Sequence, residues 1–433
     1  MGIFIPLLLI FLTCLIIWRA CDGFEIASEY AGRNLSEGVR GGTINAIASS
    51  IPELFTTLIA LFVLSDKEGF AVGIGTTAGS ALFNGMIIPA SCILVAVFAL
   101  SAAKRVNSVD VSPKVILRDG LFLIAGEILL IFILSGTSLV WWQGLVLMSF
   151  YVAYLLYMFR SMRKNQLADG TQTSADSTED DDTDEEDEDK ISRGPVANVF
   201  FWLSLGPLLD LERAFIKEHH KDKIKNETWN PWPLLLASTA VIAIACFLLV
   251  KACEWLGTGS AAHPSYELFG HSFTGLGMPA MFVAVIFASM ATSVPDTVMS
   301  IRDARDGDYD DAVANALGSN IFDICFALGF PLFLYTLIYG KIELSPEIAT
   351  QSTELRSALL LLTIIGFLLY FVGPRIKKAG KTLIPLRPWR AFALLAIYGA
   401  FVIFIVARGN EEPWAMEIAA FLRSLIEHVP KLT

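Results

Sequence analysis

Two short motifs place hydroxyls, a proline and an acid inside apolar stretches of this chain. The first runs from Ser49 to Glu53 (Ser-Ser-Ile-Pro-Glu) and the second from Thr292 to Asp296 (Thr-Ser-Val-Pro-Asp). An ionisable side chain in a membrane-spanning segment costs about 2.5–3.5 kcal/mol even on a lenient insertion scale, so it marks an ion or substrate path by default. Because the two motifs match, we expect one binding site built from two halves of the chain.

A second pair of matching motifs follows the first. Gly79 to Asn84 (Gly-Ser-Ala-Leu-Phe-Asn) is echoed by Gly318 to Asp323 (Gly-Ser-Asn-Ile-Phe-Asp). Residues three or four apart share one face of a helix, so each motif presents a hydroxyl beside a carboxylate or an amide. We expect four such oxygen pairs to converge on one point: Ser50 with Glu53, Ser80 with Asn84, Ser293 with Asp296, and Ser319 with Asp323.

The two prolines add backbone oxygen to this set. A proline inside a helix cannot donate a hydrogen bond to the carbonyl four residues earlier and pushes that carbonyl aside. Pro52 and Pro295 would therefore free the carbonyls of Ala48 and Ala291. Carboxylate, amide, hydroxyl and carbonyl oxygens suit a hard cation, and Ca²⁺ accepts about 6–8 of them. The absence of thiolate and imidazole from these motifs disfavours zinc or copper.

The charge of the acids limits which cargo the site can hold. Glu53, Asp296 and Asp323, if ionised, carry three negative charges, and such a cluster at low dielectric needs cations or protons to balance it. One Ca²⁺ leaves one charge over, whereas Ca²⁺ with one monovalent cation, or several Na⁺, balances the site. The arithmetic permits K⁺ cotransport without requiring it. It also predicts that an empty carrier crosses poorly, which is the basis of obligatory exchange.

The composition indicates which elements position these residues. The chain has 433 residues, 54% of them hydrophobic and only 17% charged, with a mean hydropathy of +0.58, whereas about a quarter of an ordinary soluble protein is charged. Apolar runs of about 17–25 residues can cross a bilayer. We therefore expect an all-α membrane protein with ten transmembrane helices, near 3–31, 42–64, 70–100, 115–135, 139–160, 233–257, 277–302, 309–339, 355–373 and 388–408.

The order of the motifs predicts two inverted-topology repeats of five helices, 1–160 and 233–408. Because five is odd, the second half enters the membrane from the opposite side, as in secondary transporters that bind cargo near the midplane. Lys and Arg gather after the odd-numbered spans, so the positive-inside rule places both termini outside. We expect 161–232 to be a cytoplasmic loop with an acidic tract and an interfacial helix, and 409–433 to be an exterior segment.

A weaker echo lies nearer the span ends. Arg19 to Asp22 (Arg-Ala-Cys-Asp) in the first span matches Lys251 to Glu254 (Lys-Ala-Cys-Glu) in the sixth. Charged side chains at such positions commonly extend toward the membrane surface or cap a helix. We therefore interpret Asp22 and Glu254 as structural, with a role in transport as the alternative.

At these motifs the chain resembles the cation/Ca²⁺ exchanger superfamily, and within it the K⁺-dependent Na⁺/Ca²⁺ exchangers most closely. The resemblance covers nearly all of the chain except the middle loop and the C-terminal end. Its two repeat motifs are highly specific. The residues that carry it are Ser49 to Thr56, Gly79 to Asn84, Ser293 to Asp296, Ala304 with Arg305, and Gly318 to Ile324.

The resemblance implies roles for the same residues. Glu53 and Asp296 would be the central Ca²⁺ ligands shared with Na⁺, and Asp323 would match the acid tied to K⁺ dependence. Ala48 and Ala291 stand where the family usually has glycine, so the helix breaks here are expected to be stiffer. The remaining ligands implied are Ser50, Ser80, Ser293, Ser319 and Asn84.

We expect a secondary antiporter that exchanges Na⁺ for Ca²⁺ with K⁺ moving alongside Ca²⁺. A Ca²⁺/H⁺ antiporter is the first alternative, because carboxylates can exchange Ca²⁺ for protons. An intramembrane hydrolase is disfavoured, because no predicted span offers a histidine base. We expect no enzymatic activity, no cofactor besides the transported ions, and the lipid bilayer as the surrounding partner. We expect no nucleic-acid binding, because the sequence has no basic cluster with interleaved aromatic residues.

Overall fold

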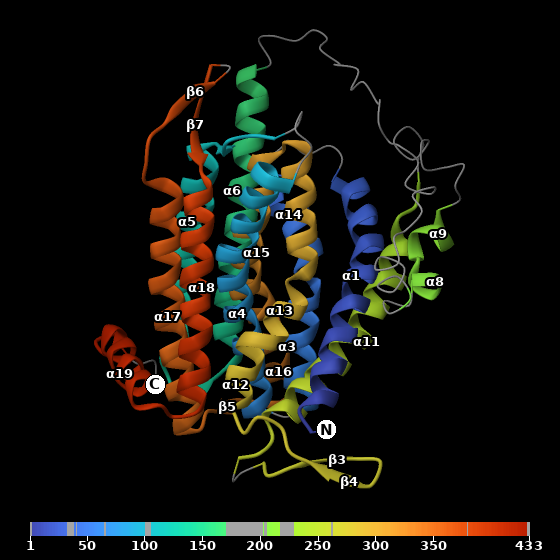
Figure 1. The fold of residues 1–433 in the computed structure, drawn as a ribbon, viewed down its shortest axis with the longest axis vertical. Coiled ribbons are helices and arrows are strands. Elements are labelled where there is room, and N and C mark those ends of the chain that lie inside the picture. The colour runs from blue at the N-terminus through green and yellow to red at the C-terminus, as the bar shows by residue number, and fades with distance from the viewer. Residues whose placement is uncertain are drawn as a thin grey trace.

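The computed structural model describes residues 2–32, 39, 41–64, 66–99, 105–169, 202, 206–216, 229–260, 263–378 and 380–430. Long helices dominate it and run roughly side by side in Figure 1. The continuous long helices are α1 (Phe4–Gly32), α4 (Asp66–Leu94), α5 (Pro113–Ile133), α6 (Trp141–Asp169), α11 (Trp232–Gly257), α17 (Pro346–Phe371) and α18 (Pro388–Gly409).

Three further stretches are helical but interrupted. They are η1 (Gly41–Asn45), α2 (Ala46–Ser49) and α3 (Ile51–Val63); then α12 (Ala280–Val283), η5 (Ala284–Ala288), α13 (Ser289–Thr292) and α14 (Val294–Asp306); and α15 (Tyr309–Phe322), η6 (Asp323–Ala327) and α16 (Gly329–Tyr339). Here η marks a π-helical turn, which commonly occurs at functional sites. The shorter helices are η2 (Val95–Ala99), α8 (Gly206–Leu209), α9 (Leu211–Phe215) and α19 (Pro413–Ile426).

Local sequence sets several helix ends. Ser112 and Ser345 cap α5 and α17, because their hydroxyls accept hydrogen bonds from the backbone N–H of Lys114 and Ile348 at 3.3 Å. A proline follows each serine at the first helical position, where its missing N–H costs nothing. Gly307 ends α14 in the left-handed conformation, with φ of 93°, which glycine adopts without strain.

Within the described residues, seven helices are long and apolar enough to cross a membrane, and nine spans result if each of two bent helix pairs is counted as one. The predicted multi-pass, helical architecture is therefore confirmed, but the count of ten is not. The segment expected near 115–135 does form a helix, α5. It carries the charged residues Lys114, Arg118, Asp119 and Glu127, so its composition is not that of a simple apolar span.

Two of the short antiparallel strand pairs join segments that are far apart in the sequence. In one sheet β7 (Lys381–Leu386) lies between β1 (Val109–Val111) and β6 (Ile376–Lys378), with Val109 opposite Leu386. At the other end of the bundle β2 (Ser138–Leu139) pairs with β5 (Ile342–Glu343). The third pair is the hairpin of β3 (Tyr266–Leu268) and β4 (His271–Phe273). The first two pairs tie the two halves of the chain together at both ends of the helices.

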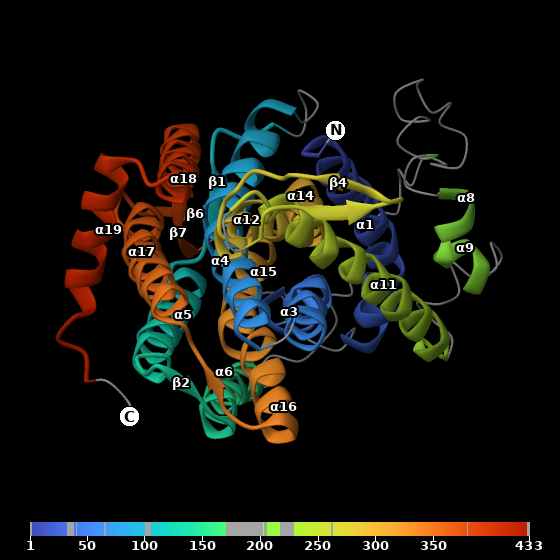
Figure 2. The ribbon, with the colours of Figure 1, turned by 90° about the horizontal axis from the view of Figure 1, so that it is seen from below.

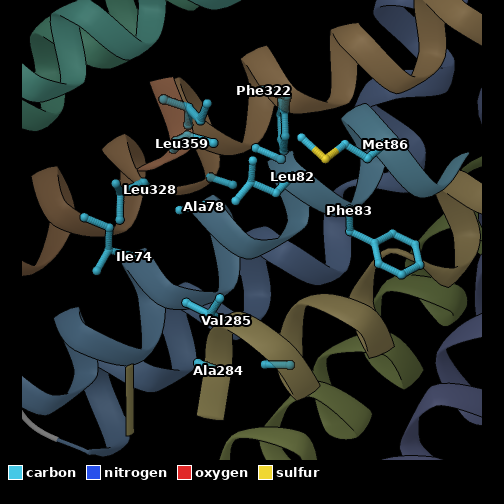
Figure 3. Packing of buried hydrophobic residues seen from close by; sticks show 14 of the residues in the cluster. Ile74, Ala78, Leu82, Phe83, Met86, Ala284, Val285, Phe322, Leu328 and Leu359 are labelled. Carbon is cyan, nitrogen blue, oxygen red and sulfur yellow. The ribbon is translucent and has the colours of Figure 1, made fainter. Parts of the chain in front are cut away.

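Helix α4 lies at the centre of the bundle. It contacts α3, α15, α17, α18 and the α12–α14 segment, and Figure 2 shows it with α15 between the α17–α19 group and the α1–α11 pair. In Figure 3 the side chains of Ile74, Ala78 and Leu82 on α4 lie among those of Leu328 and Val285 from the second half. Lipid tails are as apolar as these residues, so close packing rather than escape from water stabilises the contacts.

The middle of the chain is described only in part. The predicted acidic tract, 176–189, lies outside the described residues, as do 196–201 and 203–205 of the predicted interfacial helix, 196–216. The described portion forms two short helices, α8 and α9, and α9 packs against α1 and α11. Both chain ends lie at the same end of the bundle in Figure 1, and α6 ends at the other.

Candidate functional site: a buried polar cluster between two bent helices

Each Pro-acid motif forms a break in a helix. The chain bends by 46° between the helix ending at Ser49 and α3, and by 43° between α13 and α14. The residues at the breaks, Ser50 and Ser293, have nearly the same backbone angles, with φ of −94° and −82° and ψ of 10° and 4°. Both breaks lie two residues before a proline, as the sequence predicted.

The breaks place the two motif acids at helix N-termini. Glu53 lies in the first turn of α3, and Asp296 lies in the first turn of α14. The N-terminus of a helix carries a partial positive charge that favours an anionic side chain. Both carboxylates are fully buried. The helix ends therefore help to hold negative charge at the depth where a cation would bind.

Ser80 on α4 connects the acids of the two halves. Its Oγ lies 3.1 Å from Oε1 of Glu53, 2.8 Å from Oδ2 of Asp323 and 2.8 Å from Oγ of Ser293. Ser293 Oγ is in turn 3.4 Å from the same Glu53 oxygen. A hydroxyl has only one proton to donate, so Ser80 cannot satisfy all of these acceptors at once.

Asp296 is held more completely than Glu53. Ser319 donates to its Oδ1 at 2.6 Å, and the amide of Asn84 donates to its Oδ2 at 3.0 Å. The Asn84 amide nitrogen also lies 3.3 Å from Ser80 Oγ. Asn84 therefore joins the hydrogen bonds around Asp296 to those around Glu53 and Asp323, and the cluster is continuous across both halves.

Four buried oxygens of the cluster have no hydrogen-bond partner: Oε2 of Glu53, Oδ1 of Asp323, Oδ1 of Asn84 and Oγ of Ser50. Buried polar atoms in proteins almost always have a partner, so these oxygens are available as ligands. Their chemistry, all oxygen and largely anionic, fits Na⁺ or Ca²⁺ as cargo. Among the described residues no three His, Cys, Asp or Glu side chains together could hold one metal ion. The hydroxyls and the amide would have to share the coordination.

The structure brings most of the predicted site residues together but changes their pairing. Ser319 donates to Asp296 rather than to Asp323, and Asp323 accepts from Ser80 across the interface between the halves. Ser80 and Asn84 stay in contact within α4, while Asp296 and Asp323 accept hydrogen bonds from side chains on other helices. Ala48 and Ala291 are buried beside the two breaks, and their carbonyls as ligands remain a prediction.

Close helix contact requires glycine before both cluster serines. A Cβ at Gly79 would lie 2.4 Å from the carbonyl oxygen of Val285, and a Cβ at Gly318 would lie 2.9 Å from Gly42 Cα. Each helix therefore lies close against the bent helix of the opposite half, and Ser80 on α4 contacts Ser293 across this interface.

Asn315 on α15 belongs to the surroundings of the site and is not among the residues predicted from the sequence. Its amide nitrogen lies 3.0 Å from Ser300 Oγ and 3.5 Å from the backbone oxygen of Asp296, and its Oδ1 is 3.5 Å from Ser49 Oγ. Asn315 stands one helical turn before Ser319 on the same face. That spacing was the signal that could have identified it.

Comparison with known proteins shows the family. A family model described as sodium/calcium exchanger protein matches residues 5–160 and 230–407, which is most of the chain. The chain therefore belongs to the sodium/calcium exchanger protein family, a family of cation/Ca²⁺ exchangers within which it is most like the K⁺-dependent members. The resemblance predicted from the motifs is confirmed, as is a multi-pass membrane protein.

Named relatives are sodium/potassium/calcium exchangers. The chain is 24% identical to sodium/potassium/calcium exchanger 4 of Mus musculus, over 80% of this chain and 74% of the relative. It is 25% identical to sodium/potassium/calcium exchanger 5 of Homo sapiens, over 77% and 71%. It is 36% identical to exchanger 3 of Homo sapiens over a shorter stretch, 32% of this chain and 20% of that one.

Two solved structures are also similar. One is the sodium-calcium exchanger NCX_Mj, with 18% identity, a TM-score of 0.48, and coverage of 93% of this chain and 98% of that one. The other is the H⁺/Ca²⁺ exchanger CAX, with 13% identity, a TM-score of 0.47, and coverage of 97% and 90%.

Proposed function

We propose that this chain is a secondary antiporter that exchanges Na⁺ for Ca²⁺ by alternating access around the buried cluster. The observation that carries the proposal is the burial of Glu53, Asp296 and Asp323 in one hydrogen-bonded network. Among the described residues these three acids form no ion pair with Lys, Arg or His, and two of them have an unpartnered oxygen. Uncompensated buried carboxylates require a cation or a proton.

In this proposal Glu53 and Asp296 are the central Ca²⁺ ligands, which Na⁺ shares. Their places at the N-termini of the two bent half-helices support this role, because irregular backbone at membrane depth is tolerated where it lines a binding site. Ser50, Ser80, Ser293, Ser319 and Asn84 complete the coordination, with the carbonyls of Ala48 and Ala291. The charged empty site resists exposure to the low-dielectric interior, so each crossing requires bound cations.

We further infer that K⁺ moves with Ca²⁺ and is balanced by Asp323. Ca²⁺ neutralises two of the three negative charges. We assign the remaining charge to Asp323, whose Oδ1 has no hydrogen-bond partner. The names of the relatives, which include potassium, support the same assignment.

The orientation is part of the proposal. Residues 1–160 and 233–408 form the two inverted repeats, both termini lie outside, 161–232 lies in the cytoplasm, and 409–433 is exterior. The two marked chain ends at one end of the bundle support this arrangement. The cytoplasmic side is then the end of the bundle where α6 ends and where α14 lies.

Proteoliposomes loaded with Ca²⁺ test the proposal. An inward Na⁺ gradient should drive Ca²⁺ out, whereas a proton gradient without Na⁺ should not. Glu127→Gln is the matched control, because Glu127 is a buried acid outside the cluster that accepts from Thr363 at 2.6 Å. Ca²⁺ flux driven by protons alone would instead establish the Ca²⁺/H⁺ alternative. No Ca²⁺ flux under either gradient would contradict the proposal.

A further inference from the structure

A second group of charged residues lies beside the central cluster, between α1 and α14. A cavity there is lined by Cys21, Asp22 and Glu25 from α1 and by Ser49 and Pro295 from the two bends. Glu25 is largely buried, with 9% of its side chain exposed, and Asp22 is 28% exposed. The cavity therefore has an acidic wall on α1 and reaches the bends that carry the proposed ligands.

A short chain of polar contacts connects Ser49, at the edge of the cavity, to Asp296. Ser49 Oγ lies 3.5 Å from Oδ1 of Asn315, and the amide nitrogen of Asn315 lies 3.5 Å from the backbone oxygen of Asp296. Ser49 and Pro295 lie at the ends of α2 and α14 that meet at the cluster. Because Val298 and Met299 on α14 also line it, the cavity lies on the α14 side of the cluster.

Arg302 on α14 reaches across to this acidic wall. Its Nη1 donates to Oε1 of Glu25 at 2.7 Å, and its Nη2 is 4.0 Å from Oδ1 of Asp22. Arg19 also pairs with Asp22 at 3.7 Å, but that pair lies within α1. The pair of Arg302 with Glu25 therefore connects a bent helix that carries a proposed ligand to the neighbouring helix α1.

The inverted repeat shows that this connection is present in only one half. Lys251 and Glu254 on α11 match Arg19 and Asp22, and they pair with each other at 2.7 Å. The same correspondence places Gly257 where Glu25 would be, and the correspondence of Asp296 with Glu53 places Ile59 where Arg302 would be. The matched helices of the other half therefore have an ion pair within one helix but lack the residues for one between them.

We propose that Arg302 and Glu25 form an ionic latch that holds α14 against α1 and closes the cavity on the α14 side of the cluster. This inference rests on the proposed function, because access to one side at a time is part of alternating transport. An interaction made in only one of two states biases the equilibrium toward that state. Arg302 and Glu25 are then positioning residues for the opening step, and the cargo need not touch them.

Two native cysteines are matched reporters of the two sides. Cys21 lines the cavity next to Asp22, and Cys253 occupies the matching place on α11. Two single-cysteine chains, one keeping Cys21 and one keeping Cys253, are reconstituted in one orientation. A neutral, membrane-impermeant maleimide is added to the α14 side for Cys21 and to the opposite side for Cys253, and the rate of modification is measured with Arg302→Gln, Glu25→Gln, and the control Arg305→Gln.

Both latch variants should speed modification of Cys21 by about twofold to fivefold, because a partly exposed ion pair contributes at most about 1 kcal/mol. Both should slow modification of Cys253, since one equilibrium governs the two sides. Arg302→Gln removes a positive charge and Glu25→Gln removes a negative one. A purely electrostatic effect on the Cys21 thiol would therefore change its modification rate in opposite directions in the two variants. Loss of the latch raises the Cys21 rate in both variants. Arg305→Gln, on the exposed face of the same helix, should leave both rates unchanged.

The exchanged pair, Arg302→Glu with Glu25→Arg, should restore slow modification of Cys21, and it guards against a variant that merely folds poorly. Cys21 rates that are unchanged, or that move in opposite directions in the two single variants, would overturn the latch. Na⁺-driven Ca²⁺ flux is measured in the same vesicles. Flux that persists while the labelling prediction fails contradicts the latch alone, and flux that is absent from the parent chain contradicts the proposed function.

Discussion

The two bent helices have the same backbone form but different polar surroundings. The breaks at Ser50 and Ser293 have similar angles, and both are followed by a proline and an acid. Yet both carboxylate oxygens of Asp296 accept hydrogen bonds, whereas only one oxygen of Glu53 does. The repeat therefore sets the geometry of the site, and the neighbouring side chains make its two halves unequal. Both carboxylate oxygens of Asp296 have donors within the protein, and Oε2 of Glu53 has none among the described residues.

The second motif pair differs in charge. Asn84 in the first half stands where the second half has Asp323. Asn84 donates to Asp296, while Asp323 accepts from Ser80 and has a second oxygen without a partner. The first half thus supplies one acid and the second half supplies two. In our account the extra charge locates the monovalent cation near Asp323.

The largest expected effect comes from neutralising either central acid. Glu53→Gln and Asp296→Asn keep the side-chain volume, but each removes a charge that is worth about 4 kcal/mol to a cation at about 4 Å and an effective dielectric constant of about 20. That corresponds to about a thousandfold loss of affinity per unit of cation charge. Na⁺-driven Ca²⁺ flux should therefore be abolished in both variants. Near-normal flux in either would remove that acid from the central site.

The same two variants also test the inequality between the halves. Asp296→Asn replaces an acceptor of two hydrogen bonds by a group that can accept on only one atom, whereas Glu53→Gln disturbs an oxygen that has no partner. Thermal unfolding in detergent should therefore show a lower midpoint for Asp296→Asn than for Glu53→Gln. Equal midpoints would mean that the hydrogen bonds of Asp296 do not position it.

A smaller effect is expected from changing the charge difference of the second motif pair. Asp323→Asn removes the third charge, so Ca²⁺ exchange should persist and lose its dependence on K⁺. Asn84→Asp adds a fourth charge about 3 Å from Asp296, and like charges at this distance repel, so exchange should need more monovalent cation. Ca²⁺ flux is compared in K⁺ and in a large inert cation. A parent chain that runs equally well without K⁺ would refute the assignment to Asp323.

The smallest effect concerns the close contacts on the two sides of the repeat. Gly79→Ala places a Cβ 2.4 Å from a backbone oxygen, and Gly318→Ala places one 2.9 Å from a backbone carbon. Overpacking of this kind costs about 1–3 kcal/mol, and we expect the greater loss for Gly79→Ala. Gly366→Ala is the control, because nothing lies within 4 Å of its Cβ. Thermal unfolding midpoints should fall in the order Gly366→Ala, Gly318→Ala, Gly79→Ala, from highest to lowest. A different order would show that the helices can move apart at these contacts without loss of stability.

The sequence predicted the breaks, the family and the residues of the cluster, because prolines, acids and helical spacing are local signals. It did not predict that Ser319 donates a hydrogen bond to Asp296, or that Ser80 donates one to Asp323. Helical periodicity tells which residues share a face, but not which face of another helix lies opposite. The pair of Arg302 with Glu25 was missed for the same reason, since the two residues belong to different helices. The charged residues of α5 can be read from the sequence. Which of them are buried depends on the helices packed against α5, and the sequence of α5 alone does not show this.

Calcium binding to the purified protein in lipid nanodiscs tests most directly whether both halves build one site. Calorimetric titration is performed on the parent chain, on Glu53→Gln and on Asp296→Asn, with Glu127→Gln as the control. The account predicts one saturable Ca²⁺ per chain, and loss of that binding when either acid alone is neutralised. Two Ca²⁺ per chain, with one lost in each variant, would show two independent sites and contradict the account.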